Sequence, residues 1–239
     1  MTVHLVSLVV DAIHPADLAG FWASALRWNA RASGDLVELL PTDSTSFRLT
    51  FRPGARPKTA QNRIHLDLTT TSLDDRDSTV TGLLAAGATR IDIGQGPDEP
   101  HVVLADPEGN EFCVIEPTNR FLAGCPRLGA VNCDGTRALG HFVSRAIGWP
   151  LVWDEHEETA VQAPDHTGPK ITWSGPPLMP RHPPERFHFH VAPGAGTDTD
   201  AALNHLLDLG ATPVTATTSC PGASTLADVD GNRICLVPR

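Results

Sequence analysis

Two pairs of ionisable side chains have the spacing of neighbours on one face of a β-strand. His65 and Asp67 lie two residues apart, and so do His188 and His190. Side chains two residues apart point to the same side of a strand, and a carboxylate beside an imidazole raises the pKa of that imidazole. We therefore predict that His65, tuned by Asp67, is a general acid or base, and that the two later histidines form a second catalytic pair.

Cationic, aromatic and sulfur-bearing side chains are expected around these pairs. An arginine stands two residues before each pair, two tryptophans lie in predicted strands or loops near the rim, and each half of the chain has a cysteine in its last predicted strand. The predicted substrate-binding residues are Arg63, Arg186, Trp153, Trp173, Cys113 and Cys235.

The cysteines themselves predict little covalent chemistry. There are five of them, an odd number, and no CxxC motif is present. The sequence therefore suggests neither a disulfide framework nor a zinc knuckle. Cys113 and Cys235 are expected to pack as small buried side chains rather than to act as nucleophiles.

Apolar periodicity predicts the elements that hold these residues in place. Residues 3–10 form a predicted strand, and a helix follows from His14-Pro15 with an apolar stripe along one face. A further strand covers 63–69, with its even-numbered apolar residues facing the core and Arg63, His65 and Asp67 on the other face. Ser72 caps the next predicted helix, and residues 106–110 form the turn of a hairpin.

The two halves of the sequence repeat this pattern at an offset of 121 to 123 residues. The segment 21–28 matches 142–149, 63–67 matches 186–190, and 104–113 matches 226–235. Collinear matches of this kind indicate duplication. We predict two domains, 1–118 (modules 1–62 and 63–118) and 126–239 (modules 126–184 and 185–239), each built from βαβββ modules.

Composition excludes several classes of function. The formal net charge of −10 argues against nucleic acid as a partner, and no apolar stretch approaches the ~20 residues that a membrane helix needs. The run from Leu5 to Val10 is predicted to be a strand rather than a signal peptide. We expect a cytoplasmic protein without a membrane partner. Because the chain has no tyrosine, phenol chemistry is excluded.

At Phe21-Trp22, Arg63-Ile64-His65-Leu66-Asp67-Leu68 and Asp106-Pro107-Glu108-Gly109-Asn110 the sequence resembles the vicinal oxygen chelate superfamily. This superfamily includes glyoxalase, bleomycin-resistance and extradiol dioxygenase proteins, and the subgroup with the greatest similarity is the two-domain glyoxalase-like type of actinobacteria. The resemblance covers nearly the whole chain. It implies an α+β fold of four βαβββ modules, with curved β-sheets that cup a small ligand and helices outside.

The resemblance also implies where a divalent metal would bind in metal-dependent members. Those positions fall on Ser7, His65 and Cys113 in the first half, and on Leu128, His188 and Cys235 in the second. Only the histidine is retained in each half, so no metal cofactor is expected. A shifted register that gathers His4, His65 and Glu116 is the alternative metal set.

Three functions therefore stay open at this stage. The first is metal-independent acid–base catalysis by an isomerase, cyclase or lyase on a carbonyl-bearing or aromatic metabolite. The second is non-catalytic binding of a drug or metabolite, as in bleomycin-resistance proteins. The third is a metal-dependent lyase or dioxygenase. In each case the partner is a small molecule, and the protein is a monomer or a homodimer.

Overall fold

The computed structural model describes residues 3–96, 98–183, 185–214, 220 and 222–238. Its described strands form two eight-stranded sheets. Sheet A has the order β14-β15-β16-β13-β1-β4-β3-β2. Its strands are β1 (Val3–Ala12), β2 (Asn29–Ser33), β3 (Leu36–Leu40), β4 (Arg48–Pro53), β13 (Phe187–Pro193), β14 (Thr212–Pro213), β15 (Ser224–Ala227) and β16 (Arg233–Leu236).

Sheet B has the order β10-β11-β12-β9-β5-β8-β7-β6. Its strands are β5 (Ile64–Leu68), β6 (Thr89–Arg90), β7 (Val102–Ala105), β8 (Glu111–Val114), β9 (Leu128–Cys133), β10 (Leu151–Glu155), β11 (Glu158–Val161) and β12 (Lys170–Trp173). The helices of the described residues are α1 (Pro15–Leu26), α2 (Leu73–Ala85), α3 (Arg137–Ile147) and α4 (Thr199–Asp208). The predicted α+β fold of four βαβββ modules is thus confirmed.

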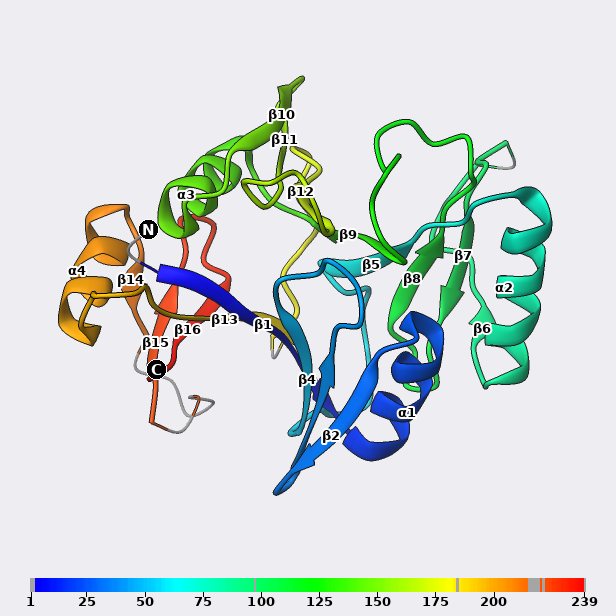
Figure 1. The fold of residues 1–239 in the computed structure, drawn as a ribbon, viewed down its shortest axis with the longest axis horizontal. Coiled ribbons are helices and arrows are strands. Elements are labelled where there is room, and N and C mark those ends of the chain that lie inside the picture. Colours follow the sequence, from blue (N-terminus) through cyan, green and yellow to red (C-terminus); the bar gives the residue numbers. More distant parts are fainter. Residues whose placement is uncertain (1–2, 97, 184, 215–219, 221, 239) are drawn as a thin grey trace.

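Each sheet joins strands from both halves of the chain (Figure 1). The first and last modules meet in sheet A, where β1 pairs antiparallel with β13, and the two middle modules meet in sheet B through β5 and β9. The predicted ranges 1–118 and 126–239 therefore each contribute one module to each sheet. The duplication is visible because the strand pair at the centre of each sheet is antiparallel and joins one half to the other.

The helix ends follow from their sequences. Pro15 begins α1, where its missing N–H is not needed. As predicted, Ser72 caps α2, because its hydroxyl oxygen accepts a hydrogen bond from the Asp75 N–H. Thr136 caps α3 in the same way. None of the described helices is long and apolar enough to span a bilayer.

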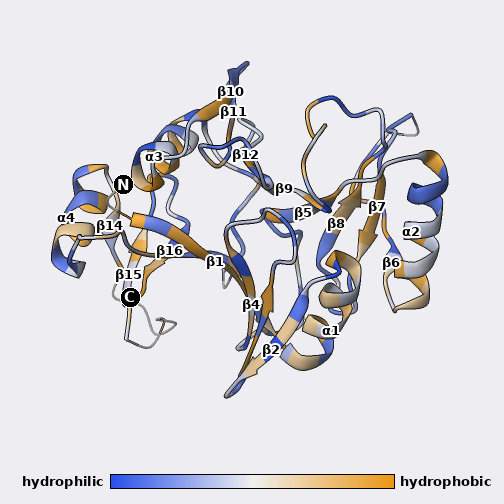
Figure 2. Cartoon of the chain, in the orientation of Figure 1, coloured by the Kyte–Doolittle hydropathy of each residue, from blue (hydrophilic) through white to orange (hydrophobic). Residues whose placement is uncertain are grey.

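The main core lies between the sheets and the helices, and Figure 2 shows hydrophobic residues along the strands β1, β7 and β8. Alternation along β5 sends Leu66 and Leu68 into this core and leaves His65 and Asp67 on the opposite face, as predicted. The same alternation on β13 buries Phe187 and Val191 in the core. We call the face of sheet B with His65 and Asp67 cup B, and the face of sheet A with His188 and His190 cup A.

Two equivalent turns connect the helices of the first and third modules to the other module of the same half, which lies in the other sheet. Glu108, in the turn between β7 and β8, accepts hydrogen bonds from the N–H groups of Ile13 and His14 before α1. Asp230 accepts equivalent bonds from the backbone and hydroxyl of Thr136 before α3. Acidic groups are favourable at helix N-termini, so these contacts help to hold the two sheets in one arrangement.

Candidate active site

Cup B gathers an imidazole, a carboxylate and a thiol. Nε2 of His65 lies 3.3 Å from Oδ1 of Asp67, its neighbour along β5. Cys113 on β8 is paired with Asp67 in the parallel ladder, so its thiol lies on the same face. Asp67 and Cys113 are buried, whereas the His65 side chain keeps 27% of its surface exposed. A ligand on this face can therefore reach the imidazole.

The charge state of this cluster follows from its neighbours. Burial alone would lower the pKa of His65, but attraction to and hydrogen bonding with Asp67, together with the contact to Cys113, raise the pKa to about 10. Burial raises the pKa of the Cys113 thiol. At neutral pH the cluster is thus an imidazolium paired with a carboxylate beside an un-ionised thiol, an arrangement suited to donating a proton rather than taking one.

An aromatic and cationic rim borders the same face. The pairs His65–Asn132, Asn132–Thr172, Thr172–Ala160 and Ala160–Trp153 run across the sheet and place Trp153 on the cup B side. Trp153 meets the ring of Phe121 edge-on at 6.0 Å. The ammonium of Lys170 lies 4.5 Å from the centre of the Phe121 ring. The predicted rim position of Trp153 agrees with its 38% exposure.

The predicted rim position of Trp173 is wrong. Trp173 is only 2% exposed and belongs to the core. It pairs with Cys133 rather than with a cup-facing residue, because it lies one residue beyond Thr172 and thus on the other side of β12. Its indole packs against Gly135 and Gly140, where an added Cβ would approach it to 2.6 and 3.1 Å.

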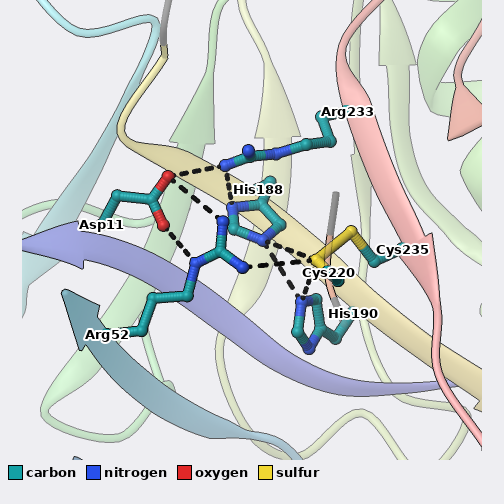
Figure 3. Close-up of a disulfide and its surroundings, with 7 residues drawn as sticks. All are labelled: Asp11, Arg52, His188, His190, Cys220, Arg233 and Cys235. Carbon is teal, nitrogen blue, oxygen red and sulfur yellow. Dashed lines mark hydrogen bonds and ion pairs between the residues drawn. A yellow bond between two sulfur atoms is a disulfide. The ribbon is translucent and has the colours of Figure 1, made fainter. Parts of the chain in front are cut away.

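Cup A places a different cluster at the equivalent positions (Figure 3). Nε2 of His188 lies 3.2 Å from Nε2 of His190, and Nε2 of His190 lies 3.1 Å from Sγ of Cys220. Cys220 is joined to Cys235 of β16 by a disulfide. This bond corrects the sequence-based expectation, which gave no disulfide, and it places both sulfurs on the face of His190, with which Cys235 is paired.

Arginines surround the two histidines of cup A. Nη2 of Arg233 lies 2.6 Å from Nδ1 of His188 and 2.8 Å from Oδ2 of Asp11. Arg52 also binds Asp11 and reaches Cys220. Burial, Arg52 and Arg233 lower the pKa of His190 to about 4. Burial, Arg233 and His190 hold the pKa of His188 far below its usual range, so both rings are neutral.

The guanidinium also fixes the tautomer of His188. An arginine can only donate hydrogen bonds, so Nδ1 of His188 must accept from Arg233. The proton of the neutral ring is then on Nε2, which donates to Nε2 of His190. Both ring nitrogens of His188 are therefore engaged inside the protein, and His188 is 1% exposed.

Arg63 and Arg186, predicted to bind substrate, join the two halves of the chain. Arg63 donates to Asp134 and to the side-chain oxygen of Asn232. Arg186 donates to Glu108 and to the side-chain oxygen of Asn110. Both arginines are buried, at 8% and 6% exposure. They stand at the ends of their strands, where the equivalent turn of the other half supplies acceptors.

Comparison with known proteins identifies the fold. A family model described as glyoxalase-like domain matches residues 7–115 and 130–237. The chain belongs to this glyoxalase-like family. It is part of the vicinal oxygen chelate superfamily, as the sequence motifs predicted.

Solved structures extend the likeness to the whole chain. Glyoxalase I from Zea mays aligns with a TM-score of 0.66 at 13% identity, covering 99% of this chain and 92% of that one. A putative dioxygenase from Bacillus subtilis aligns with a TM-score of 0.63 at 12% identity, covering 99% of this chain and 85% of that one. No match was found among curated proteins. At these identities the likeness shows the fold alone.

Some superfamily members hold a divalent metal in the cup, but the donors of cup B do not fit such an ion. His65, Asp67 and Cys113 have ligand atoms within 4.8 Å of one another. Hard divalent ions prefer oxygen and imidazole ligands that are deprotonated. One of these three donors is a thiol, a softer ligand than hard ions prefer, and the facing position on β9 is Ala130, which offers no ligand atom.

The donors of cup A fit no better. His188, His190, Cys220 and Cys235 also lie within 4.8 Å of one another, yet the two sulfurs are tied in a disulfide. A metal-binding histidine normally donates its second N–H to a carboxylate or carbonyl, whereas Nδ1 of His188 faces the guanidinium of Arg233. Two cationic side chains beside the cluster further oppose a dication.

The alternative metal set from the sequence is not brought together. His4 lies on β1 of sheet A, and His65 lies on β5 of sheet B. Among the described residues, neither His4 nor Glu116 is in a group of three or more ligand atoms close enough to share an ion.

Sequence reasoning missed several residues that shape the two clusters. Phe121 and Lys170 complete the rim of cup B, and Arg52 with Asp11 and Cys220 completes the cluster of cup A. The strand pairing explains the position of Arg52. His188 is paired with Val9 of β1, and Asp11, two residues further along β1 on the same face, is paired with Arg52 of β4. Phe121 and Cys220 come from loops, which have no periodicity to read.

Proposed function

We propose that the protein is a metal-independent enzyme that binds a small carbonyl-bearing or aromatic metabolite in cup B and catalyses an isomerisation, cyclisation or elimination. The observation that carries this proposal is the partly exposed His65 lying 3.3 Å from the Asp67 carboxylate, a contact that raises the pKa of the imidazole. An imidazolium can protonate or polarise a carbonyl oxygen, and this favours transfer of a proton from the adjacent carbon to a water molecule acting as the base. Asp67 keeps the ring charged and oriented.

The rim of cup B supports the same choice of ligand. Trp153 and Phe121 offer two exposed aromatic surfaces, at 38% and 37% exposure, and Lys170 adds a positive charge beside them. Flat apolar groups stack on such rings, while the ammonium favours an acidic or carbonyl substituent. Membership of a superfamily that uses this face for small ligands is consistent with the proposal, although the fold by itself does not specify the reaction.

Hydrogen–deuterium exchange at carbon tests this proposal. A panel of small ketones, aldehydes and 2-oxo acids in D₂O is followed by NMR with and without the protein. We expect faster exchange next to the carbonyl of one panel member. His65→Gln should reduce the rate by about 10²–10⁴, the usual contribution of a general acid. Because the acid is protonated up to about pH 10, the rate should fall only above that pH.

Two control variants separate cup B from other imidazoles. His141 pairs with Asp154 at 3.1 Å on α3, outside both cups, so His141→Gln should leave the rate unchanged. His188→Gln tests cup A directly and should change the rate far less than His65→Gln. Equal losses in the His65 and His188 variants, or no loss in either, would contradict the assignment to cup B.

Non-catalytic binding is the alternative, and the same aromatic rim favours it. In that case a flat ligand would bind with a stoichiometry of about one, quench the fluorescence of Trp153, and be recovered unchanged by mass spectrometry. Trp153→Leu would then weaken binding while His65→Gln would not. A metal-dependent reaction would instead require bound iron, manganese, nickel or zinc, which elemental analysis and metal-restored activity would detect.

A further inference from the structure

A cavity of about 300 Å³ lies where α3 meets sheet A. This volume is at the lower end of the range of small-molecule pockets. Its walls also include residues 54–64 and reach His188 and Arg233 at the edge of cup A. The cavity is lined by Leu139 and Val143 of α3, by Phe187 and Phe189 of β13, and by Asp228 and Ile234.

The other half of the molecule fills the equivalent space with protein. Trp22 of α1 occupies the position that Val143 occupies on α3, 121 residues later. The Trp22 ring packs against Phe112 of β8 at a centroid distance of 5.0 Å, and the residue equivalent to Phe112 on β16 is Ile234. Two large aromatic side chains are thus replaced by two smaller aliphatic ones, which leaves room between the helix and the sheet.

A hydrogen-bond acceptor is preserved although its donor is missing. In the filled half, Nε1 of Trp22 donates to Oδ2 of Asp106 at 3.0 Å, and Asn110 donates to the same oxygen. The equivalent carboxylate, Asp228, keeps the bond from Asn232 to Oδ2, but the valine at position 143 has no N–H to give. Asp228 is 7% exposed and lines the cavity.

The electrostatics of Asp228 agree with an incompletely compensated carboxylate. Burial raises the pKa of Asp228 to about 6, although hydrogen bonds from Asn232 and the Asp230 backbone oppose the rise. A buried carboxylate with spare acceptor capacity is stabilised by any additional donor. The cavity therefore combines an apolar slot with one acceptor that could receive an N–H.

We propose that this cavity is a binding site for a planar aromatic molecule with one N–H or O–H donor, of which indole is the simplest. The ring would lie between Val143 and Ile234, as the Trp22 ring lies against Phe112, and the donor would bind Oδ2 of Asp228. This site is separate from His65 and does not depend on the function proposed for cup B.

Calorimetric titration of the full-length chain with indole and with benzofuran tests the proposal. Benzofuran has nearly the same shape but replaces the N–H with an oxygen. Indole should bind saturably, and benzofuran should bind at least ~10-fold more weakly, because a hydrogen bond to a charged group is lost. Benzofuran binding as tightly as indole would overturn the role of Asp228, and an absence of saturable indole binding would overturn the site.

Substitutions that refill the space locate the ligand. Val143→Trp copies the filled half, so it should abolish indole binding. Arg145→Trp places the same side chain on the exposed side of α3 and should leave the affinity within about twofold. If Val143→Trp does not fold, Ile234→Phe fills the cavity from the strand side. His65→Gln should have no effect. Unchanged affinity in both filling variants would exclude this cavity as the site.

Discussion

Cup A and cup B carry histidines at equivalent positions of the duplicated fold, yet the imidazole of His65 in cup B is charged and that of His188 in cup A is neutral. His65 and His188 both begin an i, i+2 pair, and both lie across from a central antiparallel strand. The next residue on the same face is Asp67 in one cup and His190 in the other. The pKa of His65 is raised to about 10, whereas that of His190 is lowered to about 4.

The cationic neighbours amplify this difference. Arg52 and Arg233 reach the histidines of cup A from β4 and β16, while the described contacts of His65 are with Asp67 and Cys113. A duplicated fold therefore fixes where an imidazole stands, but the residues beside it decide whether the imidazole donates a proton. This is why cup B is the better candidate for catalysis although the more extensive His and Cys cluster is in cup A.

The largest effect is expected from making cup B resemble cup A. In Asp67→His the carboxylate that stabilises the imidazolium is gone, while burial still favours the neutral ring. We expect the pKa of His65 to fall from about 10 to below its ordinary value of 6.5. Titration of the imidazole ¹⁵N signals by NMR measures this shift. An unchanged pKa would show that Asp67 does not control His65.

The same shift has a consequence for stability. A group whose pKa is higher in the folded than in the unfolded protein stabilises the fold fully below the unfolded value and loses this effect as the pH rises through the folded value. The free energy of unfolding of the wild type should therefore decrease between pH 6.5 and pH 10 relative to Asp67→Asn. Denaturant titrations at several pH values measure this free energy. If its dependence on pH were the same in the wild type and in Asp67→Asn, the pairing of His65 with Asp67 would contribute nothing to stability.

A second, smaller effect concerns the sulfur atoms. Cys235 is bonded to Cys220 across a separation of 15 residues, whereas its equivalent, Cys113, is free. Chain-entropy arguments give about 3 kcal/mol for closing a loop of this size. Cys220→Ala should lower the free energy of unfolding by about this amount, and a reducing agent should abolish most of the difference. Cys113→Ala is the matched substitution, and its effect should not depend on the reducing agent.

The smallest effect is expected from removing one cation beside cup A. Arg52 is the charged neighbour that lowers the pKa of His190 most strongly after burial. In Arg52→Gln the pKa of His190 should rise by roughly one unit from about 4. Arg31→Gln is the control, because Arg31 is paired with Glu38 at the exposed edge of sheet A. Equal shifts in both variants would mean that the effect is not local.

The fold and the central site residues could be predicted from the sequence because they follow from periodicity and duplication. Strand alternation put His65, Asp67, His188 and His190 on the faces where they lie, and the offset of the two halves located the equivalent turns. The pairing of the first module with the last could not be read in this way, because alternation describes one strand at a time and does not name its neighbour.

The errors have equally specific causes. Trp173 was placed on the wrong face because the ladder register of β12 was unknown, and a shift of one residue exchanges the two faces. Arg63 and Arg186 share a face with the histidines but stand at strand ends, where acceptors from the other half bind them. The Cys220–Cys235 bond depends on a loop path that no local pattern specifies.

The nesting of the two sheets bears on the order in which the chain assembles during synthesis. The strands of sheet B are contiguous in the sequence, from Ile64 to Trp173, while those of sheet A flank them on both sides. Since translation proceeds from the N-terminus, sheet B can close as soon as β12 has left the ribosome. The strand β1 is made first but cannot pair with β13 until that strand has been synthesised. Until then, the backbone edge of β1 that later binds β13 is open to pairing with a wrong strand.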